Sequence, residues 1–180
     1  LSPYALTKQV DEEYARLFGR LYGMETIGLR YFNVFGRRQD PEGPYAAVIP
    51  LFTIQYKKKI SPVIHGDGTH SRDFTYIDNV VLANNLAATV TDSNALNTVY
   101  NVACGERVTI GELALRLKEN LARFDDSISL VQPEFGPERE GDVAHSLASI
   151  DKARSLLGYE PVVFFDEGLK RAAEWYFRTY

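Results

Sequence analysis

Cysteine is the scarcest reactive residue in this sequence. Cys104 is the only cysteine among 180 residues, which excludes an internal disulfide and a cysteine-based metal site. This usage fits a reducing compartment, and we expect a cytoplasmic protein. The histidines His65, His70 and His145 lack partner ligands at helical or hairpin spacing, so we expect solvated or hydrogen-bonded side chains and no metal.

Long apolar runs and a basic surface are missing as well. No stretch approaches the ~20 apolar residues that cross a bilayer, and no secretory pattern opens the sequence, so we expect neither a transmembrane helix nor a leader. The net charge of -4 disfavours a nucleic-acid partner, because neutralising phosphates requires a basic surface. The run Lys57-Lys58-Lys59 is a local exception, which we expect to be the solvated end of a helix.

Helical and β-rich segments alternate through the chain. Apolar residues at three- and four-residue steps predict a first helix that begins near Ser2 or Pro3 and ends at Tyr22, before Gly23. Further helices are predicted over 47–56, 79–90, 110–123, 151–157 and 166–180, and strands over 26–34, 98–103 and 128–131. Asp78 is the predicted cap of the third helix, and Thr109 with Glu112 forms a capping box for the fourth.

This alternation indicates an α/β architecture. The segment 61–77 is predicted to form two short extended pieces around a glycine turn. Its strands follow one another too closely for a crossover helix, so we expect some short strands to pair in a separate lobe.

Tyr4 and Lys8 lie four residues apart on the first predicted helix, so the lysine ammonium is expected beside the phenol oxygen. A nearby positive charge favours the phenolate, which would let Tyr4 act as a general base toward an alcohol. An exposed tyrosine and lysine at a helix start would have the same spacing, so the pair alone decides nothing.

The surrounding segments follow a longer pattern. In order they read SPYALTK, GLRYFNVFG, HGDGTHSRDFTYIDN, YNVACGE, EREGDVAHS and LGYEP. They resemble the extended short-chain dehydrogenase/reductase family of NAD-dependent nucleotide-sugar epimerases and dehydratases, and within it the UDP-N-acetylhexosamine 4-epimerase branch. The resemblance covers essentially the whole chain. It implies the C-terminal part of a Rossmann-type doubly wound parallel sheet plus a small mixed α/β substrate-binding lobe, with NAD as cofactor, a UDP-sugar substrate and a homodimer.

The resemblance implies catalytic roles for two residues and a cofactor contact for a third. Tyr4 would take the proton from the sugar 4-hydroxyl, and Lys8 would bind the nicotinamide ribose and tune the tyrosine. Phe32 lies where the family's chain passes the nicotinamide, mainly through its backbone. The alternative is that Phe32 is part of the strand core.

Two arginines are suited to a diphosphate, because a guanidinium offers paired donors to phosphate oxygens. These are Arg72 in SRDF and Arg139 in EREGD. The resemblance implies that Asn33 also bonds the diphosphate and that Asp142 accepts from the uridine ribose hydroxyls.

The resemblance also implies contacts to the base and the sugar. Ala47 and Val48 would offer backbone groups to the nucleotide, and Val63 and His65 belong to the strand beneath the uracil. Ser146 lies where the family faces the C2 substituent of the sugar. A bulky tyrosine there excludes acetylated sugars, whereas serine leaves room for an N-acetyl group, so both acetylated and plain hexoses remain candidates.

A dinucleotide site also requires a glycine-rich turn between a strand and a helix. Gly66-Asp67-Gly68 lacks the third glycine and the context. We therefore expect the glycine fingerprint to lie before Leu1 and the chain to be the C-terminal part of an epimerase, inactive alone. Residues 1–45 would be a Rossmann remnant and 46–180 mainly the substrate lobe, with 76–105 returning to the sheet.

Other interpretations stay open at this point. The same substrate frame would suit a 4,6-dehydratase or a decarboxylase of the family, and the chain could be a non-catalytic fragment that binds nucleotide-sugar or only assembles. Apolar faces on the helix over 7–22 and the strand over 26–34 predict self-association, because exposed apolar area costs about 25 cal/mol per Å².

Overall fold

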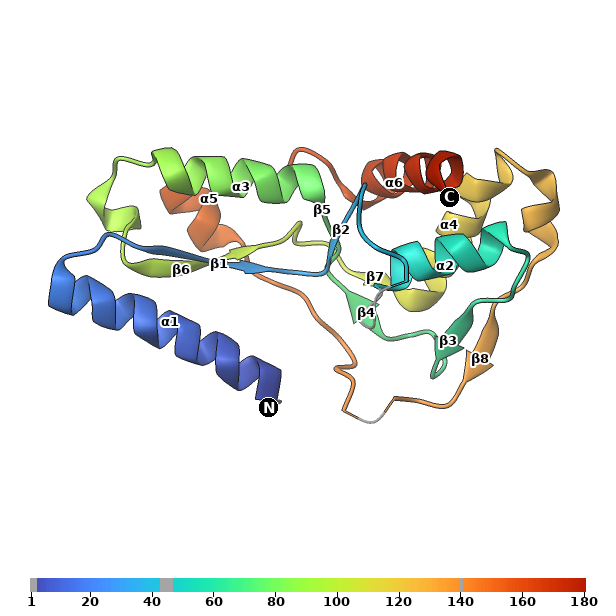
Figure 1. The fold of residues 1–180 in the computed structure, drawn as a ribbon, viewed down its shortest axis with the longest axis horizontal. Coiled ribbons are helices and arrows are strands. Elements are labelled where there is room, and N and C mark those ends of the chain that lie inside the picture. Colours follow the sequence, from blue (N-terminus) through green and yellow to red (C-terminus); the bar gives the residue numbers. More distant parts are fainter. Residues whose placement is uncertain (1–2, 43–46, 140) are drawn as a thin grey trace.

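The computed structural model describes residues 3–42, 47–139 and 141–180, which form two packed groups of helices and short strands (Figure 1). The first group surrounds the strand pair β1–β6, and the second is a lobe of three helices. Short strand pairs lie in and between them. Ser2, the predicted start of the first helix, is outside the described residues.

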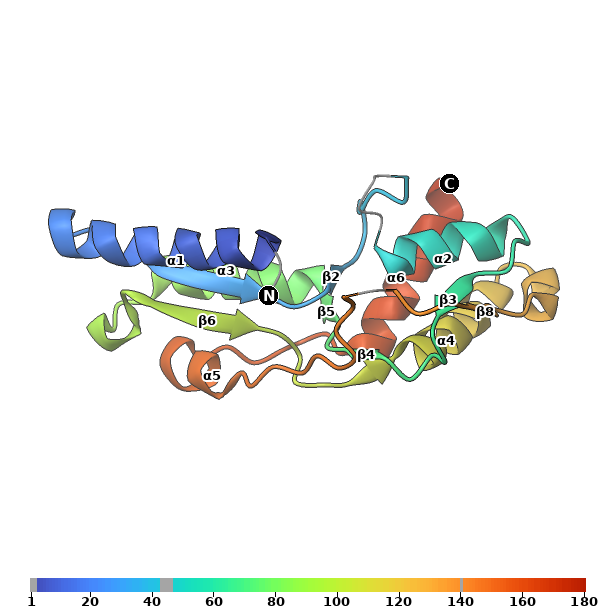
Figure 2. The same cartoon turned by 90° about the horizontal axis from the view of Figure 1, so that it is seen from below.

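The first group is centred on two parallel strands. β1 (Ile27–Tyr31) pairs with β6 (Thr98–Val102) along its whole length. α1 (Pro3–Tyr22) lies on one face of this pair, whereas α3 (Ile77–Thr89) and α5 (Asp151–Leu157) cover the other (Figures 1 and 2). The covered face is apolar, so the group has a core on the α3 and α5 side only.

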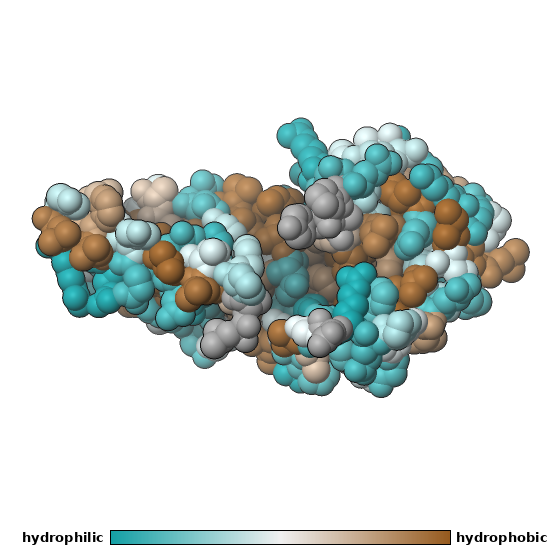
Figure 3. All heavy atoms as spheres, turned by 60° about the horizontal axis from the view of Figure 1, so that its bottom comes forward, coloured by the Kyte–Doolittle hydropathy of each residue, from teal (hydrophilic) through white to brown (hydrophobic). Residues whose placement is uncertain are grey.

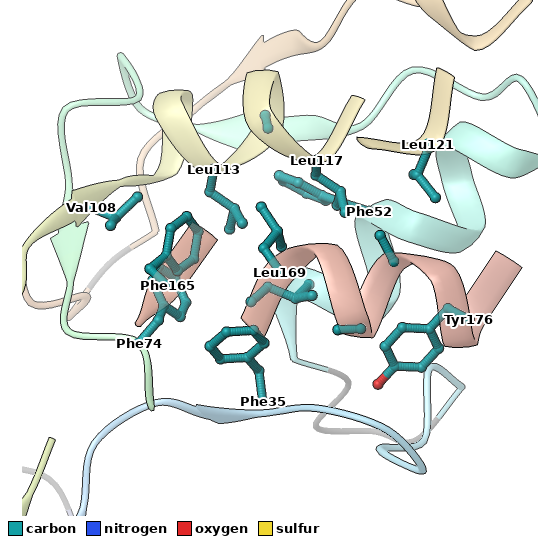
Figure 4. Close-up of a cluster of buried hydrophobic side chains, with 14 of the residues drawn as sticks. Phe35, Phe52, Phe74, Val108, Leu113, Leu117, Leu121, Phe165, Leu169 and Tyr176 are labelled. Atoms are coloured by element: carbon teal, nitrogen blue, oxygen red, sulfur yellow. The ribbon is translucent and has the colours of Figure 1, made fainter. Parts of the chain in front are cut away.

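The second group is the three-helix lobe of α2 (Val48–Lys57), α4 (Ile110–Ala122) and α6 (Phe165–Thr179). α4 forms because Leu113, Leu117 and Leu121 recur every four residues and place one apolar stripe on the core. Figure 4 shows this core, which phenylalanines from β2 and from the chain before β5 also enter. Its labelled members are Phe35, Phe52, Phe74, Val108, Leu113, Leu117, Leu121, Phe165, Leu169 and Tyr176.

Three pairs of short strands complete the fold. β2 (Val34–Phe35) is parallel to β5 (Thr75–Tyr76), and β3 (Val63–His65) is parallel to β8 (Glu134–Gly136). β4 (Ser71–Arg72) is antiparallel to β7 (Val108–Thr109). Two 3-10 helices, Ser93–Ala95 and Asp126–Leu130, lie in connections. Within the described ranges, no helix combines the length and apolarity needed to cross a bilayer.

The α/β class and the helix positions predicted from sequence are confirmed, and the capping box of Thr109 and Glu112 is present. Three local predictions are wrong. Asp78 lies in the first turn of α3, whose N-cap is Tyr76 without a side-chain hydrogen bond. The acidic side chain still suits the positive end of the helix dipole, although the helix begins two residues earlier than predicted.

The other two errors concern strands. The predicted strand over 128–131 is part of the 3-10 helix Asp126–Leu130, where the side chain of Asp125 accepts a hydrogen bond from the Ser127 N–H and Ile128 is fully buried. Ile128 is apolar because it is buried, whereas Leu130 in the same run is exposed. The strand over 26–34 is split into β1 and β2, because Asn33 between them has a left-handed φ of 35°.

The lysine run lies at the C-terminal end of α2, as predicted. Lys57 donates to the Phe177 carbonyl oxygen at 2.6 Å, and its ammonium lies 4.8 Å from the centre of the Phe177 ring. Lys59 forms an ion pair of 2.6 Å with Asp125, which lowers the pKa of that carboxyl to about 2. Two of the three lysines therefore bind neighbouring groups of the lobe.

None of the side chains of α1 is buried. Its exposed apolar residues include Val10, Tyr14, Leu17, Phe18 and Leu21, and brown side chains are visible along this end of the molecule in Figure 3. The ion pair between Glu12 and Arg30, at 2.6 Å, ties α1 to β1. α1 thus has unusual apolar content for a helix without any buried side chain.

The capping box gives a direct test of the fold. Thr109→Ala removes both the acceptor for the Glu112 N–H and the donor to the Glu112 carboxylate. We expect the free energy of unfolding to fall by about 1 kcal/mol, measured by urea denaturation. The matched control Thr91→Ala, in an exposed loop, should change it by less than about 0.5 kcal/mol. Equal effects of the two substitutions would contradict the capping role.

Candidate functional site

Arg72 on β4 is held in one orientation by hydrogen bonds. Its Nη2 donates to Asp142 Oδ1 at 2.6 Å, and its Nη1 donates to the carbonyl oxygens of Ser71 at 2.9 Å and Ala144 at 3.3 Å. The side chain is 15% exposed. A guanidinium that is oriented in advance and largely shielded from water is well suited to bind an anion.

The carboxylate of Asp142 lies between two basic side chains. One oxygen contacts Arg72, and the other lies 3.8 Å from His70 Nδ1. The backbone N–H of Asp142 donates to the Arg139 carbonyl oxygen at 3.2 Å, whereas the Arg139 side chain is exposed. Among the described residues, no group of three or more His, Cys, Asp or Glu side chains could hold a metal ion. The cluster therefore offers a guanidinium and a carboxylate side by side to a ligand.

The segment after β8 reaches β4 through residue Ser71. The Ser71 N–H donates to Ala144 O at 2.9 Å, and the Ser146 N–H donates to Ser71 O at 3.0 Å. Ser71 Oγ lies 2.9 Å from His145 Nδ1, so this predicted hydrogen-bonding histidine is confirmed as such. These contacts bring Asp142 and Ser146 beside Arg72 from some 70 residues along the chain.

β3 lies beside the chain that leads to Arg139. Val63 and His65 pair with Glu134 and Gly136 of β8, and His65 Nδ1 lies 3.0 Å from the Pro137 carbonyl oxygen. Val63 is exposed and His65 is half-buried. The strand predicted to lie beneath a base is thus joined to β8, the strand that precedes Arg139 and Asp142 in the chain.

Asn33 is positioned by Asp73, a residue that the sequence reasoning missed. Asn33 Nδ2 donates to the Asp73 carbonyl oxygen at 3.0 Å. The Asp73 carboxylate is fully buried and accepts from the Cys104 and Gly105 N–H groups, each at 3.0 Å. Burial raises the pKa of this carboxyl, and the backbone donors oppose that shift. An acidic residue between an arginine and a phenylalanine carries no sequence signal of such burial.

Tyr4 and Lys8 lie near the N-terminal end of α1. Tyr4 is 71% exposed, and the Lys8 ammonium lies 5.8 Å from the centre of its ring. Lys8 donates its hydrogen bond to Asp11 at 2.8 Å, and this carboxylate is the main reason that the pKa of Lys8 is raised, with Tyr4 a smaller contributor. Sequence reasoning missed Asp11, although its three-residue spacing was visible.

The remaining predicted residues are mostly fixed by backbone contacts. The Phe32 N–H donates to Val102 O at 3.0 Å, and its half-buried ring packs on the core of the first group. Ala47 is the N-cap of α2 without a side-chain hydrogen bond, and Val48 begins the helix and packs on the lobe core.

Most of the predicted residues therefore fall into two sets. The first set, on β3, β4 and the segment after β8, is tied together by hydrogen bonds, whereas Tyr4 and Lys8 stand apart on α1. Four further predicted residues belong to neither set: Phe32, Asn33, Ala47 and Val48. The N-terminal end of α1 lies near the middle of the molecule in both ribbon views, on the side of the segment after β8 (Figures 1 and 2). Figure 3 shows that this face is hollowed between the α1 end and the lobe.

The chain matches known proteins along nearly its full length. The model of the NAD dependent epimerase/dehydratase family matches residues 1–103. A putative UDP-glucose 4-epimerase of Methanocaldococcus jannaschii is 40% identical over 175 residues, which are 97% of this chain and 53% of that protein. The chain thus spans about half the length of the curated relatives it matches.

Two solved structures show the same fold. A UDP-glucose 4-epimerase from Thermotoga maritima with UDP-glucose has a TM-score of 0.89 at 38% identity, over 99% of this chain and 54% of that one. A UDP-N-acetylglucosamine 4-epimerase from Methanobrevibacter ruminantium, in complex with UDP-N-acetylmuramic acid, gives 0.88 at 38% identity, over 99% and 55%. The matches confirm the fold class and the family that the sequence predicted.

The contact between Lys8 and Asp11 gives a prediction for the α1 set. A carboxylate favours the charged ammonium, so Asp11→Asn should lower the pKa of Lys8, measured by NMR titration of the lysine side chain. Tyr4→Phe should lower it less. A larger effect of Tyr4→Phe would contradict the assignment of Asp11 as the main partner.

Proposed function

Because the chain belongs to the NAD dependent epimerase/dehydratase family, we propose that the protein is an NAD-dependent 4-epimerase of UDP-sugars, working in the cytoplasm. The observation that carries the proposal is Arg72, a largely buried arginine fixed beside the Asp142 carboxylate. That arrangement suits a nucleoside diphosphate. The named relatives, which include 4-epimerases of UDP-glucose and UDP-N-acetylglucosamine, support the same substrate class.

In this proposal the diphosphate binds the guanidinium of Arg72, with Arg139 and Asn33 as further donors. The ion pair with Asp142 holds Arg72 in place before the ligand arrives. Phosphate oxygens then compete for the Nη2 donor, and the freed Asp142 oxygen accepts from the ribose hydroxyls. Charge-assisted bonds of this kind are short and directional, so they also orient the sugar.

The nucleoside end is assigned to α2 and β3. The N-cap residue Ala47 makes no side-chain hydrogen bond, so Ala47 and Val48 stand where the backbone N–H groups of the first turn of α2 need acceptors. Val63, which is exposed, and His65, which is half-buried, would lie beneath the uracil. These assignments rest on the backbone geometry together with the family resemblance.

In this proposal Tyr4 takes the proton from the sugar 4-hydroxyl while the hydride on carbon 4 leaves, so that a ketone forms transiently at that carbon. Return of the hydrogen to the opposite face of that carbon gives the epimer, and Tyr4 gives its proton back to the oxygen. The positive charge of Lys8, held nearby by Asp11, stabilises the phenolate. When bound, NAD supplies the acceptor and donor for the hydrogen at carbon 4.

The residues present fit only part of an NAD site. The exposed phenol and ammonium of Tyr4 and Lys8 can bind the nicotinamide ribose, and the backbone of Phe32 lies at the carboxyl end of β1, where α/β folds bind cofactors. The 180 residues contain no glycine-rich strand-to-helix turn for the pyrophosphate. We therefore propose that these 180 residues alone do not epimerise a sugar.

The division into a Rossmann part and a substrate lobe is proposed with the boundaries 1–45 and 46–180, with 76–105 returning to the sheet. The two separate buried clusters support this division. α5 packs in the cluster of the first group, around β1 and β6. We also propose that the protein self-associates as a homodimer, because the apolar side chains of α1 are open to solvent.

The first prediction from the proposed function concerns proton transfer. In the full-length protein, Tyr4→Phe should lower kcat for 4-epimerisation by about 10²- to 10⁴-fold, because the phenol oxygen is the base. Binding of the UDP-sugar should remain. Tyr14→Phe, also exposed on α1, is the matched control and should keep wild-type turnover. Wild-type kcat in Tyr4→Phe would rule out the proposed base.

The second prediction concerns the diphosphate. Arg72→Ala should weaken UDP binding by about tenfold or more, measured by titration calorimetry, because charge-assisted hydrogen bonds are lost. The control Arg123→Ala, exposed at the end of α4, should leave the affinity unchanged. Equal affinities of the Arg72 variant and the parent would contradict the assigned site.

The third prediction concerns sugar choice. Ser146→Tyr fills the space proposed for an N-acetyl group, so kcat/KM for UDP-N-acetylglucosamine should fall at least tenfold relative to UDP-glucose, about the discrimination that a steric pocket provides. The control Ser155→Tyr, exposed on α5, should preserve the ratio. An unchanged ratio in Ser146→Tyr would show that this residue does not face the sugar.

A further inference from the structure

The segment that carries Asp142 and Ser146 has no regular secondary structure. Between β8 and α5, its described residues form neither a helix nor a named strand. Nevertheless it supplies the proposed contacts to the ribose and to the sugar C2 group. The sugar contact therefore depends on whatever fixes this segment against the rest of the site.

Ser71 is one of the residues that hold this segment in place. The segment and β4 meet there as a single parallel bridge. Ser71 and His145 are the bridge partners. The Ser71 N–H donates to Ala144 O and its carbonyl oxygen accepts from the Ser146 N–H, at 2.9 and 3.0 Å. The neighbouring Arg72 adds a longer bond to Ala144 O at 3.3 Å.

Backbone hydrogen bonds do not by themselves specify which residue lies opposite Ser71, because every residue of an extended segment offers the same groups. The side chains do. Ser71 Oγ lies 2.9 Å from His145 Nδ1, and Ser71 is 1% exposed. The bond forms with either the hydroxyl or the ring N–H as donor, so one geometry serves both histidine tautomers.

Register matters here because side chains of an extended segment alternate between its two faces. His145 points to Ser71, so Ser146, the next residue, faces the other way. A slip of one residue would exchange these directions and turn Ser146 away from the proposed sugar site. It would also leave the buried Ser71 hydroxyl without its partner, which is unfavourable.

We infer that the hydrogen bond between Ser71 and His145 sets the register of the 142–146 segment on β4 and thereby determines which sugars the site accepts. Neither residue touches the sugar. They are positioning residues, and Ser146 is the residue that they position. This inference rests on the proposed function for its consequence, but the register itself is a property of the chain alone.

The register is tested without any ligand. Hydrogen–deuterium exchange followed by mass spectrometry should show faster exchange of the amides in 142–147 for Ser71→Ala and His145→Ala, by about fivefold or more, the factor that one net hydrogen bond represents. Ser71→Thr, which keeps the hydroxyl, should exchange these amides as slowly as the parent protein. Ser155→Ala on α5 is the control and should not change this segment. Unchanged exchange in both alanine variants overturns the inference.

The consequence for sugar choice is tested by activity of the full-length protein. The ratio of kcat/KM for UDP-N-acetylglucosamine to that for UDP-glucose should shift at least threefold in each single variant, and Ser71→Thr should return it to the parent value. The double variant Ser71→Ala/His145→Ala should shift the ratio no further than either single change, because both remove the same bond. A purely structural defect would lower kcat/KM for both substrates by the same factor and leave their ratio unchanged. An unchanged ratio would therefore overturn the inference.

These results separate the two claims. If the protein epimerises both sugars with an unchanged ratio in every variant, the positioning claim fails and the proposed function stands. If exchange responds as expected but no variant or parent epimerises a UDP-sugar, the register is supported and the proposed function fails.

Discussion

The ion pair between Arg72 and Asp142 is the interaction on which the proposed substrate site depends. It joins a two-residue strand to an irregular segment some 70 residues later, at 2.6 Å and with the arginine mostly shielded from water. An unpaired guanidinium shielded from water to this extent would cost desolvation free energy. The carboxylate neutralises its charge and also fixes its orientation. A nucleoside diphosphate can then replace one anion by another without creating a buried unpaired charge.

The two residues of this pair lie on different kinds of structure, a short strand packed on the lobe core and an irregular segment. β4 is fixed by β7 and by the lobe core behind Phe74 and Val108, whereas the segment after β8 is fixed by its bonds to β4 and, further along, by the burial of Ala148 and Ile150 in the core of the first group. Asp73 fastens the same region from behind, because its buried carboxylate holds the backbone of 104–105 while its carbonyl oxygen holds Asn33. Arg72 and Asn33 thus both donate to backbone carbonyl oxygens of the stretch 71–73, Arg72 to that of Ser71 and Asn33 to that of Asp73.

Features that depend on nearby residues could be predicted from the sequence. The apolar stripe of α4 and the capping box at Thr109 involve positions three or four apart, and both are present. The predicted strand over 128–131 failed because Ile128 is apolar for burial in the core and not for pairing. Arg72 and Asp142 were identified through the family resemblance, but the bond of Ser71 to His145 was invisible, since local patterns do not reveal which distant segments meet.

The most direct test of the central claim is a time course of UDP-N-acetylglucosamine with the full-length protein and NAD, followed by proton NMR of the sugar. Inversion at carbon 4 changes the couplings of its hydrogen, so the product identifies the reaction. We predict that UDP-N-acetylgalactosamine accumulates, and that the same equilibrium mixture is reached from either sugar. A 4-keto-6-deoxy product, or no conversion by folded protein that binds the sugar, would contradict the account.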